Sequence, residues 1–261
     1  IGEVSDRLRA RVMATGELMA TRIGAAYLAH EGLDVQWLDA RTLLHAEERP
    51  GASARANYLS ATCVFEPDPA LQQRLAAGHS VLLTQGFIAS DSRGETVLLG
   101  RGGSDTSGSY LAAKLHARRL EIWTDVPGMF TANPRAVPNA RLLKSLDYDE
   151  AQEIASSGAK VLHPRCILPA KQYSIPVSVH ATPTPDMEGT VITATVAGGE
   201  EVFLLGNREI AVDSKIDVYS EASPLGAAIM GLAEGASTSY IAPNGREIAV
   251  TVTKVETYTG Q

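Results

Sequence analysis

The sequence predicts an α/β protein in which a layered domain with a mainly parallel sheet is followed by a smaller, mostly β domain. In the first two thirds of the chain, short apolar runs typical of buried strands alternate with helical patterns. Pro183, Pro185 and Gly189 then break this alternation. Beyond the break, short strand patterns follow one another across turns. We therefore expect two domains, residues 1–192 and 193–261.

The N-terminal pattern is helical. In residues 4–30 apolar side chains recur at spacings of three to six, with many alanines and no proline. Gly16 leaves open whether this is one helix or two, and Gly32 is typical of the residue just past a helix end. The next predicted elements are a strand at 35–38, a short helix within 39–48, a strand at 62–65 and a proline-initiated helix at 69–77.

Strands and helices then alternate. We expect, in order, a strand at 80–84 continued by 85–89, a turn at 91–95, a strand at 97–99, a helix at 106–118, a strand at 120–123, helices at 148–157 and 164–173, and a strand at 176–180. Asp147 or Asp149 suits the N-cap of the helix at 148–157.

The tail has a different sequence pattern, with short predicted strands in place of alternating strands and helices. Strands are predicted at 191–196, 202–205, 216–219, 237–241 and 248–253, with one short helix at 225–232. Asn244-Gly245 between the last two strands is a strong hairpin signal.

Composition excludes several classes of protein. Apolar residues make up 44% and charged residues 20%, which is typical of a globular chain and not of a disordered one. No run approaches the ~20 apolar residues that span a bilayer, and no secretory signal is recognisable, so we expect a cytoplasmic protein without membrane contact. Cys63 and Cys166 are expected to be buried and free. The net charge of −7 argues against direct nucleic-acid binding, and no cluster has zinc-like spacing.

A glycine-rich loop is the strongest local signal. Leu99-Gly-Arg-Gly-Gly-Ser-Asp-Thr106 leads into a predicted helix. Glycines let a backbone approach a ligand, a helix N-terminus offers N–H donors to an anion, and Arg101 adds a guanidinium suited to a carboxylate or phosphate. The alternative is a tight turn capped by Ser104 or Asp105.

Three further segments carry candidate residues. Thr124 and Asp125 end a strand, where α/β sheets bind ligands, although in isolation a capped turn is the favoured interpretation. Lys160 lies between two chain breaks, where a phosphate contact competes with a plain solvated charge. Glu17 lies on the first helix, and spacing alone favours a solvent-facing side chain. His163 precedes a proline and is expected to be structural.

Together these segments resemble the aspartate kinases. The resemblance rests on Gly16-Glu-Leu-Met, Thr84-Gln-Gly-Phe, the Gly-Arg-Gly-Gly-Ser-Asp loop, Trp123-Thr-Asp-Val-Pro-Gly and Gly158-Ala-Lys-Val-Leu-His-Pro, in this order and spacing. It covers residues 1–192 and is strongest to enzymes fused to diaminopimelate decarboxylase and to lysine-sensitive aspartokinases. It implies an amino-acid-kinase-like three-layer sheet domain.

The resemblance also implies a reaction, the transfer of the γ-phosphoryl group of ATP, with Mg²⁺, to the side-chain carboxylate of L-aspartate. This is the first step towards lysine, threonine and methionine. By motif, the substrate would be bound by Glu17, Phe87, Arg101 and Ser104. Asp105 would organise the site, and Lys160 would neutralise the transferred group. The nucleotide would be held by Thr124, Asp125, Phe130, Arg135 and Lys160.

One motif of that family is missing from this sequence. Aspartate kinases open with a strand and Lys-Phe-Gly-Gly-Thr-Ser, whose lysine and glycines contact the phosphates, whereas the first lysine here is Lys114. We therefore expect that residue 1 corresponds to a point inside the kinase domain. Phosphotransfer should be impaired, because loss of a transition-state charge costs several kcal/mol.

The tail resembles the C-terminal domain of the transcript-cleavage factors GreA and GreB. The resemblance rests on Glu201-Val-Phe-Leu-Leu-Gly, Ile216-Asp-Val-Tyr-Ser, Ser223-Pro-Leu-Gly and Ala242-Pro-Asn-Gly. It implies an FKBP-like β domain that docks on RNA polymerase and contributes no catalytic residue.

Two alternatives to an aspartate kinase follow. The chain could be a non-enzymatic module that binds RNA polymerase through residues 193–261, or a chimera, natural or designed, without selected function. An exposed edge strand would favour homodimers.

Overall fold

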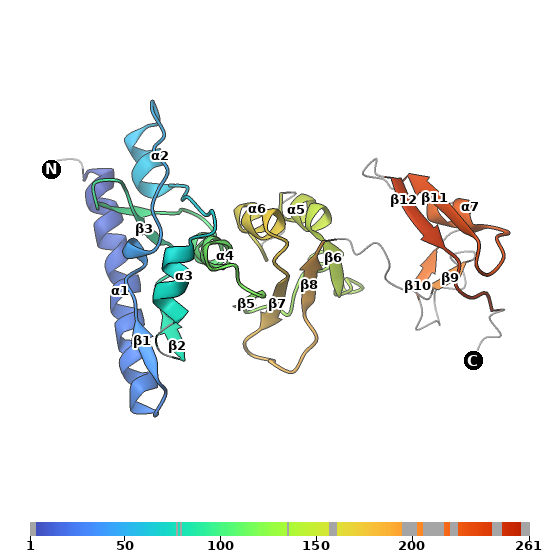
Figure 1. The fold of residues 1–261 in the computed structure, drawn as a ribbon, viewed down its shortest axis with the longest axis horizontal. Coiled ribbons are helices and arrows are strands. Elements are labelled where there is room, and N and C mark those ends of the chain that lie inside the picture. Colours follow the sequence, from blue (N-terminus) through green and yellow to red (C-terminus); the bar gives the residue numbers. More distant parts are fainter. Residues whose placement is uncertain are drawn as a thin grey trace. The chain divides into compact units, whose positions relative to one another are not determined.

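The computed structural model describes residues 4–76, 78, 80–134, 136–156, 161–194, 203–205, 217–219, 224–241 and 247–256. The chain divides into two compact units, residues 1–195 and 196–261 (Figure 1). The first unit contains, in order, α1 (Asp6–His30), β1 (Val35–Trp37), the 3-10 helix η1 (Ala40–Thr42), α2 (Ala54–Leu59), α3 (Pro69–Ala76), β2 (Val81–Leu83), β3 (Ile88–Ser90), β4 (Thr96–Leu98), α4 (Gly103–Leu115), β5 (Leu120–Thr124), β6 (Ser145–Asp147), α5 (Tyr148–Ser156), α6 (Pro164–Gln172), β7 (Val177–Ala181) and β8 (Thr190–Thr193).

Helix α1 is continuous over 25 residues. Ser5 caps its N-terminus, accepting a hydrogen bond from the Leu8 N–H at 3.3 Å. It ends before Gly32, whose φ of +86° suits glycine, as predicted. The two-helix alternative at Gly16 is wrong, because one glycine costs a long helix only about 1 kcal/mol.

Small side chains bring α1 close to the neighbouring hairpin. Ala10 and Ala14 are its buried residues, and they join Ala40, Ile88 and Leu98 in one apolar cluster. Ile88 and Leu98 lie opposite each other on the antiparallel strands β3 and β4. The packing of α1 on this hairpin therefore depends on alanine at the contact.

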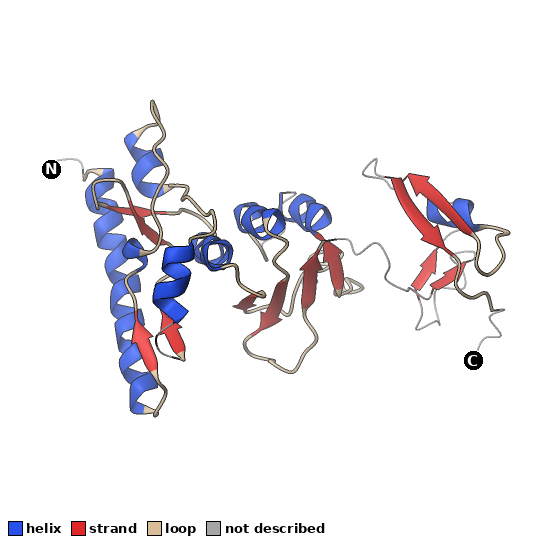
Figure 2. Cartoon of the chain, in the orientation of Figure 1, coloured by secondary structure: helices blue, strands red, loops and turns tan. Residues whose placement is uncertain are grey.

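The strands form three sheets in this unit (Figure 2). β1 and β2 pair in parallel, β3 and β4 pair antiparallel, and a four-stranded sheet has the order β5-β7-β8-β6. Within it, β5 is parallel to β7 and β6 to β8, whereas β7 and β8 are antiparallel. The unit is therefore a mixed α/β fold, as the sequence predicts.

Helices α5 and α6 lie together over the four-stranded sheet (Figure 1). The largest core cluster joins strand residues to helix residues. It includes Ile122, Leu146, Val177, Val179 and Ile192 from the sheet and Ala113, Ala151, Ala155, Ile167 and Ala170 from α4, α5 and α6. Asp147 begins α5 in a capping box, since its carboxylate accepts from the Glu150 N–H at 2.8 Å and Glu150 accepts from the Asp147 N–H at 2.9 Å.

Several predicted elements differ in the structure. The strand predicted at 62–65 is wrong, because Cys63 makes only an isolated bridge with Ala46. The short helix within 39–48 is reduced to η1, and neither α2 nor β6 was predicted. The strand at 80–89 is split into β2 and β3, because Phe87 adopts a φ of +70°.

One strand was predicted in the wrong domain. The pattern at 191–196 corresponds to β8, which pairs with β7 and β6 of the first unit and therefore does not belong to the tail. Short apolar runs look alike whichever sheet they join, so the pattern alone does not assign them.

The second unit contains β9 (Phe203–Leu205), β10 (Asp217–Tyr219), α7 (Pro224–Ile229), β11 (Ser237–Ile241) and β12 (Glu247–Thr251). β9 and β10 pair in parallel, and β11 and β12 pair antiparallel with Ser237 opposite Thr251. These elements match the predicted strands and helix of the tail. Asn244-Gly245, predicted as the hairpin turn, lies outside the described residues.

Both cysteines are buried and free, as predicted. Burial raises the pKa of each thiol to about 12, so neither is a reactive thiolate near neutral pH. Among the described residues, no helix has the length and apolarity that crossing a bilayer would require.

A buried amide joins three segments of the first unit. Gln85 is almost fully buried; its Oε1 accepts from the Ala40 N–H at 2.9 Å, and its Nε2 donates to Thr21 Oγ1 at 2.8 Å and to the Leu38 carbonyl at 3.2 Å. Thr21 Oγ1 in turn donates to the Glu17 carbonyl at 2.8 Å. The amide therefore fixes α1 and the end of β1 against the segment that follows β2.

We predict that Gln85→Met lowers the free energy of unfolding by about 2–4 kcal/mol, because it leaves buried backbone groups without partners. Tryptophan fluorescence in urea measures this directly, since both tryptophans, Trp37 and Trp123, lie in the first unit. Gln73→Met on the exposed side of α3 is the matched control and should change stability by less than about 0.5 kcal/mol. Equal destabilisation by the two variants would contradict the role of Gln85.

Candidate active site

The glycine-rich loop forms a tight turn between β4 and α4. Gly100 and Gly102 have φ of +79° and +63°, values that favour glycine, and the Gly103 N–H bonds the Gly100 carbonyl at 3.1 Å. Gly102 is the N-cap and provides no side-chain cap. The alternative that Ser104 or Asp105 caps the turn is wrong, because both lie inside the helix. The Gly103 N–H is used within the turn, whereas the next two N–H groups of α4, those of Ser104 and Asp105, have no partner among the described residues and can face an anion.

The loop packs tightly on the Gly86-Phe87 segment. A Cβ added to Gly86 would lie 2.9 Å from Ser104, and one added to Gly103 would lie 2.6 Å from the Phe87 ring. The Phe87 N–H donates to Ser107 Oγ on the second turn of α4 at 2.9 Å. Among the predicted substrate-binding residues, Phe87 and Ser104 are therefore brought together directly.

Arg101 and Asp105 flank this contact. Arg101 is exposed at the tip of the turn, and Asp105 is partly buried on the first turn of α4. Within the described residues, the Arg101 guanidinium has no hydrogen-bond or ion-pair partner. Burial raises the pKa of the Asp105 carboxyl above its usual range, with His163 opposing this rise.

His163 is a neighbour of the site that the sequence assigned only a structural role. It caps α6, where its Nδ1 accepts from the Arg165 N–H at 3.3 Å, so the structural role is confirmed. It also packs on the loop, because a Cβ on Gly102 would lie 2.2 Å from His163 Cβ. Burial, then Arg165 and Arg101, lowers the pKa of His163, which keeps it neutral at pH 7.

Arg165 anchors the loop and was not singled out from the sequence. Its guanidinium donates to the Leu99 carbonyl at 2.7 Å and to the Ala61 carbonyl at 2.5 Å. Arginine in the first turn of a helix gives no sequence signal of this role, because its carbonyl partners lie more than 60 residues away in the chain.

Glu17 lies beside the hydrogen-bond network of Gln85, because Thr21 Oγ1 bonds both the Glu17 carbonyl and the Gln85 amide. It lies on α1 one turn before Thr21, and Leu18 beside it joins Phe87 at the edge of the same apolar cluster. Its side chain is half-buried, and its carboxylate has no ion-pair partner within the described residues. The side chain of Glu17 is therefore not fully exposed to solvent, as its spacing on the helix alone would favour.

Thr124 and Asp125 lie at the C-terminal end of β5. Thr124 Oγ1 donates to Asp125 Oδ1 at 3.2 Å, and the Asp125 side chain is exposed. Trp123, beside them, stacks on His180 of β7 with ring centroids 4.8 Å apart.

The loop that follows β5 is anchored by Thr190. Thr190 Oγ1 accepts from the Met129 N–H at 2.8 Å and donates to the Leu143 carbonyl at 2.6 Å. Phe130, next in the loop, forms an isolated bridge with Leu142. The candidate nucleotide residues Thr124, Asp125 and Phe130 thus lie at the end of β5 and on the anchored loop that follows it.

Two candidates, Arg135 and Lys160, lie outside the described residues. The described chain resumes at Val161, and His163 two residues later is already packed on Gly102.

The glycine loop and the end of β5 lie at the same end of the first unit. Helix α4 descends from the loop, and β5 returns beside it, with a Cβ on Gly108 only 3.3 Å from Leu120. From this contact, the helix runs back over five residues, about 7.5 Å, to Gly103. The strand runs forward over four residues, about 13 Å, to Thr124. The carboxyl end of a strand in an α/β sheet is where ligands bind.

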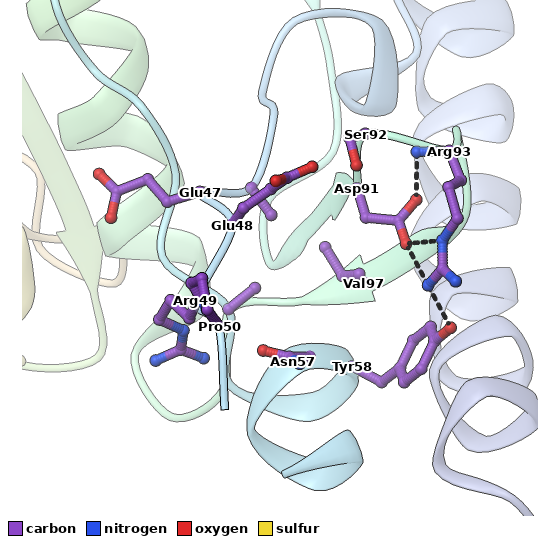
Figure 3. Close-up of a pocket in the computed structure, with 12 residues that line it drawn as sticks. Glu47, Glu48, Arg49, Pro50, Asn57, Tyr58, Asp91, Ser92, Arg93 and Val97 are labelled. Carbon is purple, nitrogen blue, oxygen red and sulfur yellow. Dashed lines mark hydrogen bonds and ion pairs between the residues drawn. The ribbon is translucent and has the colours of Figure 1, made fainter. Parts of the chain in front are cut away.

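A separate cavity of about 390 Å³ lies near the β3–β4 turn and contains none of the predicted residues (Figure 3). Both of its guanidinium groups already donate to other groups of the protein. Arg93 donates to Asp91 and to Tyr58 Oη, and Arg49 donates to the Ala56 and Ser60 carbonyls. It is therefore the weaker candidate for a polar ligand.

Comparison with known proteins gives two family matches. Residues 2–180 match the model of the amino acid kinase family, and residues 188–257 match that of the transcription elongation factor GreA/GreB C-terminal domain. These matches bear out both resemblances expected from the sequence.

The relatives of the first match are aspartokinases. Lysine-sensitive aspartokinase 3 of Escherichia coli is 38% identical over 195 residues, covering 72% of this chain and 41% of that protein. The bifunctional aspartokinase/homoserine dehydrogenase of Buchnera aphidicola is 40% identical over 188 residues, covering 72% of this chain and 22% of that protein. The chain therefore spans less than half the length of these relatives.

A solved structure confirms the predicted amino-acid-kinase-like fold. The structure of E. coli aspartokinase III in complex with aspartate and ADP superposes with a TM-score of 0.64 at 37% identity, over 73% of this chain and 42% of that one. With a family model that covers more than half of its residues, this chain belongs to the amino acid kinase family.

Proposed function

We propose that the chain carries the aspartate kinase reaction, the transfer of the γ-phosphoryl group of ATP to the side-chain carboxylate of L-aspartate. The observation that supports this most is the convergence of Phe87, Ser104 and Asp105 at the N-terminus of α4, which has no side-chain cap. Arg101 lies beside them and has no partner among the described residues. The 37% identical structure with aspartate and ADP supports the same substrates.

The proposed aspartate site matches the charges of its ligand. L-Aspartate carries one ammonium and two carboxylates at neutral pH. The Glu17 carboxylate, which has no ion-pair partner in the described part of the chain, suits the ammonium. The Arg101 guanidinium suits the α-carboxylate through two parallel hydrogen bonds. The Ser104 hydroxyl adds a donor, and the Phe87 ring supports the substrate from the side of the apolar cluster. The side-chain carboxylate is then left to face the nucleotide.

Thr124, Asp125 and Phe130 would hold the nucleotide, because they lie on one loop anchored at the end of β5. Arg135 would face the phosphates, and Lys160 would neutralise the transferred group. Both are cations in segments adjoining the described site, and the motif spacing is their only support.

Asp105 would organise the cationic groups around the phosphates. The described residues include no cluster of three or more metal-ligating side chains. Mg²⁺ would therefore be held chiefly by the ATP phosphates, where it would neutralise charge on the γ-phosphoryl group.

The reaction requires no activated nucleophile from the protein. The substrate carboxylate is already ionised at neutral pH, so it attacks the γ-phosphorus directly and no general base is needed. The γ-phosphoryl–oxygen bond to ADP breaks as the acyl-phosphate bond forms. Catalysis then consists of positioning and charge neutralisation, which are the tasks that fixed loops and cations perform.

A second function is proposed for the tail. The match of residues 188–257 to the GreA/GreB C-terminal domain favours contact with RNA polymerase. The sequence predicts a boundary between the two functional domains at residues 192 and 193. Because β8 extends to Thr193 in the sheet of the first unit, we propose that the boundary lies just after β8. We also propose that both domains lie in the cytoplasm, where ATP, aspartate and RNA polymerase are found together.

We predict that the chain, given ATP, Mg²⁺ and aspartate, forms an acyl phosphate that hydroxylamine traps as aspartyl hydroxamate. Arg101→Ala should lower kcat/KM for aspartate about 10- to 100-fold, mainly through KM, because it removes one charged hydrogen-bonding group. Lys160→Ala should lower kcat about 100- to 1,000-fold, because it removes a transition-state charge.

Arg93→Ala is the matched control, since this exposed arginine lies on the β3–β4 turn. It should leave hydroxamate formation unchanged. If the wild-type chain forms no hydroxamate at saturating substrate, or if Arg93→Ala is as damaging as Arg101→Ala, the proposal is wrong.

Asp105→Asn is predicted to stabilise the ligand-free protein while reducing hydroxamate formation at least about 100-fold. The pKa of Asp105 is raised by burial, so the folded state binds this proton more tightly than the unfolded chain does. Its contribution to stability therefore falls as pH rises above the ordinary carboxyl value of 3.8, and the variant should gain in Tm at pH 7 but not at pH 3.

Thermal unfolding of the two proteins across this pH range tests the prediction. Asp186→Asn, at an exposed aspartate, is the control and should alter neither Tm nor activity. A loss of Tm at pH 7 in Asp105→Asn would show that the carboxylate is stabilising and would contradict the argument.

RNA polymerase immobilised on beads should retain the full chain, and an excess of GreA should displace it. Size-matched bovine albumin gives the background. Retention that GreA leaves unchanged would argue against a Gre-type contact.

A further inference from the structure

Arg165 lies at the start of α6, and its backbone is fixed against α4. The Ser109 hydroxyl of α4 donates a hydrogen bond to the carbonyl of Cys166, the residue that follows Arg165. The Arg165 N–H is itself used in the cap of α6, where it donates to His163 Nδ1. Helices α4 and α6 pack on each other (Figure 1). The Arg165 guanidinium therefore extends from a backbone that is held on the body of the first unit.

The guanidinium lies where the end of β4 leaves the pairing of the hairpin and the glycine-rich loop begins. The Leu98 carbonyl accepts from the Ala61 N–H at 2.8 Å. The Leu99 N–H donates to the Phe87 carbonyl at 2.9 Å. The Leu99 carbonyl, the next acceptor along the chain, receives Arg165 at 2.7 Å. Arg165 thus takes the place that a neighbouring strand would have, at the last residue before the turn.

Both carbonyls that Arg165 bonds belong to buried residues. Leu99 is 0% exposed and Ala61 is 2% exposed. A buried carbonyl that loses its donor keeps the full penalty of its removal from water. We therefore expect that, without the guanidinium, the backbone at the start of the loop moves to find another donor.

The start of α6 holds the loop on both sides of Arg101. On one side Arg165 bonds the Leu99 carbonyl, and on the other side Gly102 packs against His163. Arg101 has a glycine before it and a glycine after it. Because glycine leaves the backbone free to adopt many conformations, the direction of the Arg101 side chain depends on these two contacts.

We propose that Arg165 is a positioning residue for aspartate. By holding the Leu99 and Ala61 carbonyls, it sets the loop conformation in which the Arg101 guanidinium meets the α-carboxylate of the substrate. The inference rests on the proposed function, because it takes Arg101 as the group that binds this carboxylate. Arg165 itself does not touch the substrate and acts through the loop.

The kinetics of hydroxamate formation by the full chain test the proposal. Arg165→Ala should raise KM for aspartate about 10-fold, because misplacement of Arg101 weakens its two hydrogen bonds to the substrate. A merely structural role would have another signature. Partial unfolding lowers the concentration of active enzyme and so the apparent kcat, but it leaves KM for aspartate unchanged.

The double variant Arg101→Ala, Arg165→Ala tests the route of the effect. If Arg165 acts through Arg101, its removal from Arg101→Ala should raise KM for aspartate less than about 2-fold further, since the effects of coupled residues do not add. A further rise of about 10-fold would show an effect that is independent of Arg101, and it would contradict the proposal.

Arg49→Ala is the matched control. Arg49 also donates to two backbone carbonyls, those of Ala56 at 2.7 Å and Ser60 at 2.9 Å, but it does not bond the loop. This variant loses the same kind of interaction and should leave KM for aspartate within about 2-fold of the wild type. An equal rise of KM in Arg49→Ala and Arg165→Ala would contradict a specific role of Arg165.

Arg165→Lys separates the charge of Arg165 from its two hydrogen bonds. The lysine keeps a positive charge but lacks the planar fork that spans both carbonyls. We expect KM for aspartate to rise at least about 5-fold, and the same cycle with Arg101→Ala applies if Arg165→Ala does not fold. A KM equal to that of the wild type would show that the charge alone suffices, and it would overturn the proposal.

Hydrogen exchange distinguishes failure of this inference from failure of the proposed function, because it requires no turnover. The backbone amides of residues 100–106 should exchange at least about 5-fold faster in Arg165→Ala or Arg165→Lys than in the wild type, and at the wild-type rate in Arg49→Ala. Unchanged exchange in the Arg165 variants would overturn the inference, whether or not the chain is a kinase. An active wild type whose KM does not depend on Arg165 would overturn it and leave the proposed function intact. A wild type that forms no hydroxamate would overturn the proposed function and, with it, the substrate role of Arg165.

Discussion

The buried amide of Gln85 is the interaction on which the candidate site depends. It bonds two segments that are distant from it in sequence, Thr21 on α1 and, after β1, the Leu38 carbonyl and the Ala40 N–H. A buried amide left without partners costs several times what a satisfied one contributes, so only one arrangement of these segments is stable. Because Gly86-Phe87 follows directly, the same amide sets the position of the surface against which α4 begins.

The glycines of the loop serve packing more than ligand approach. Gly86, Gly102 and Gly103 each leave room for a neighbouring protein group, respectively Ser104, His163 and Phe87. Arg165 of α6 donates a hydrogen bond to the Leu99 carbonyl and so fixes the start of the loop. The free N–H groups of α4 and the exposed position of Arg101 follow from this loop conformation. This arrangement partly buries Asp105, and burial disfavours the charged form of its carboxyl group. A cation bound beside this carboxylate would relieve that cost, so ligand binding and local stability are coupled.

Local patterns predicted most of the helices and the order of the site motifs, because capping residues, proline and apolar periodicity act over a few residues. Gly32, Asp147 and Pro164 each mark a helix boundary correctly. The failures share one cause, which is tertiary contact. Cys63 lies in a strand-like run but forms only an isolated bridge, with Ala46. The run at 191–196 pairs with strands of the first unit, as β8, and not with strands of the tail. At the site, the importance of Arg165 and Gln85 depends on carbonyl and N–H groups far along the chain, which no local pattern encodes.

Helix α1 shows how the same sequence can serve several constraints at once. One side needs small residues to approach the hairpin, and a second carries Thr21 and Glu17 towards the Gln85 network. A third side exposes large apolar side chains, among them Val12, Met19 and Ile23. Apolar residues on two opposite sides cancel in any single-face measure of amphipathicity, so the helix is easily read as merely alanine-rich. Its exposed side chains are too large and too closely aligned to be scattered surface residues.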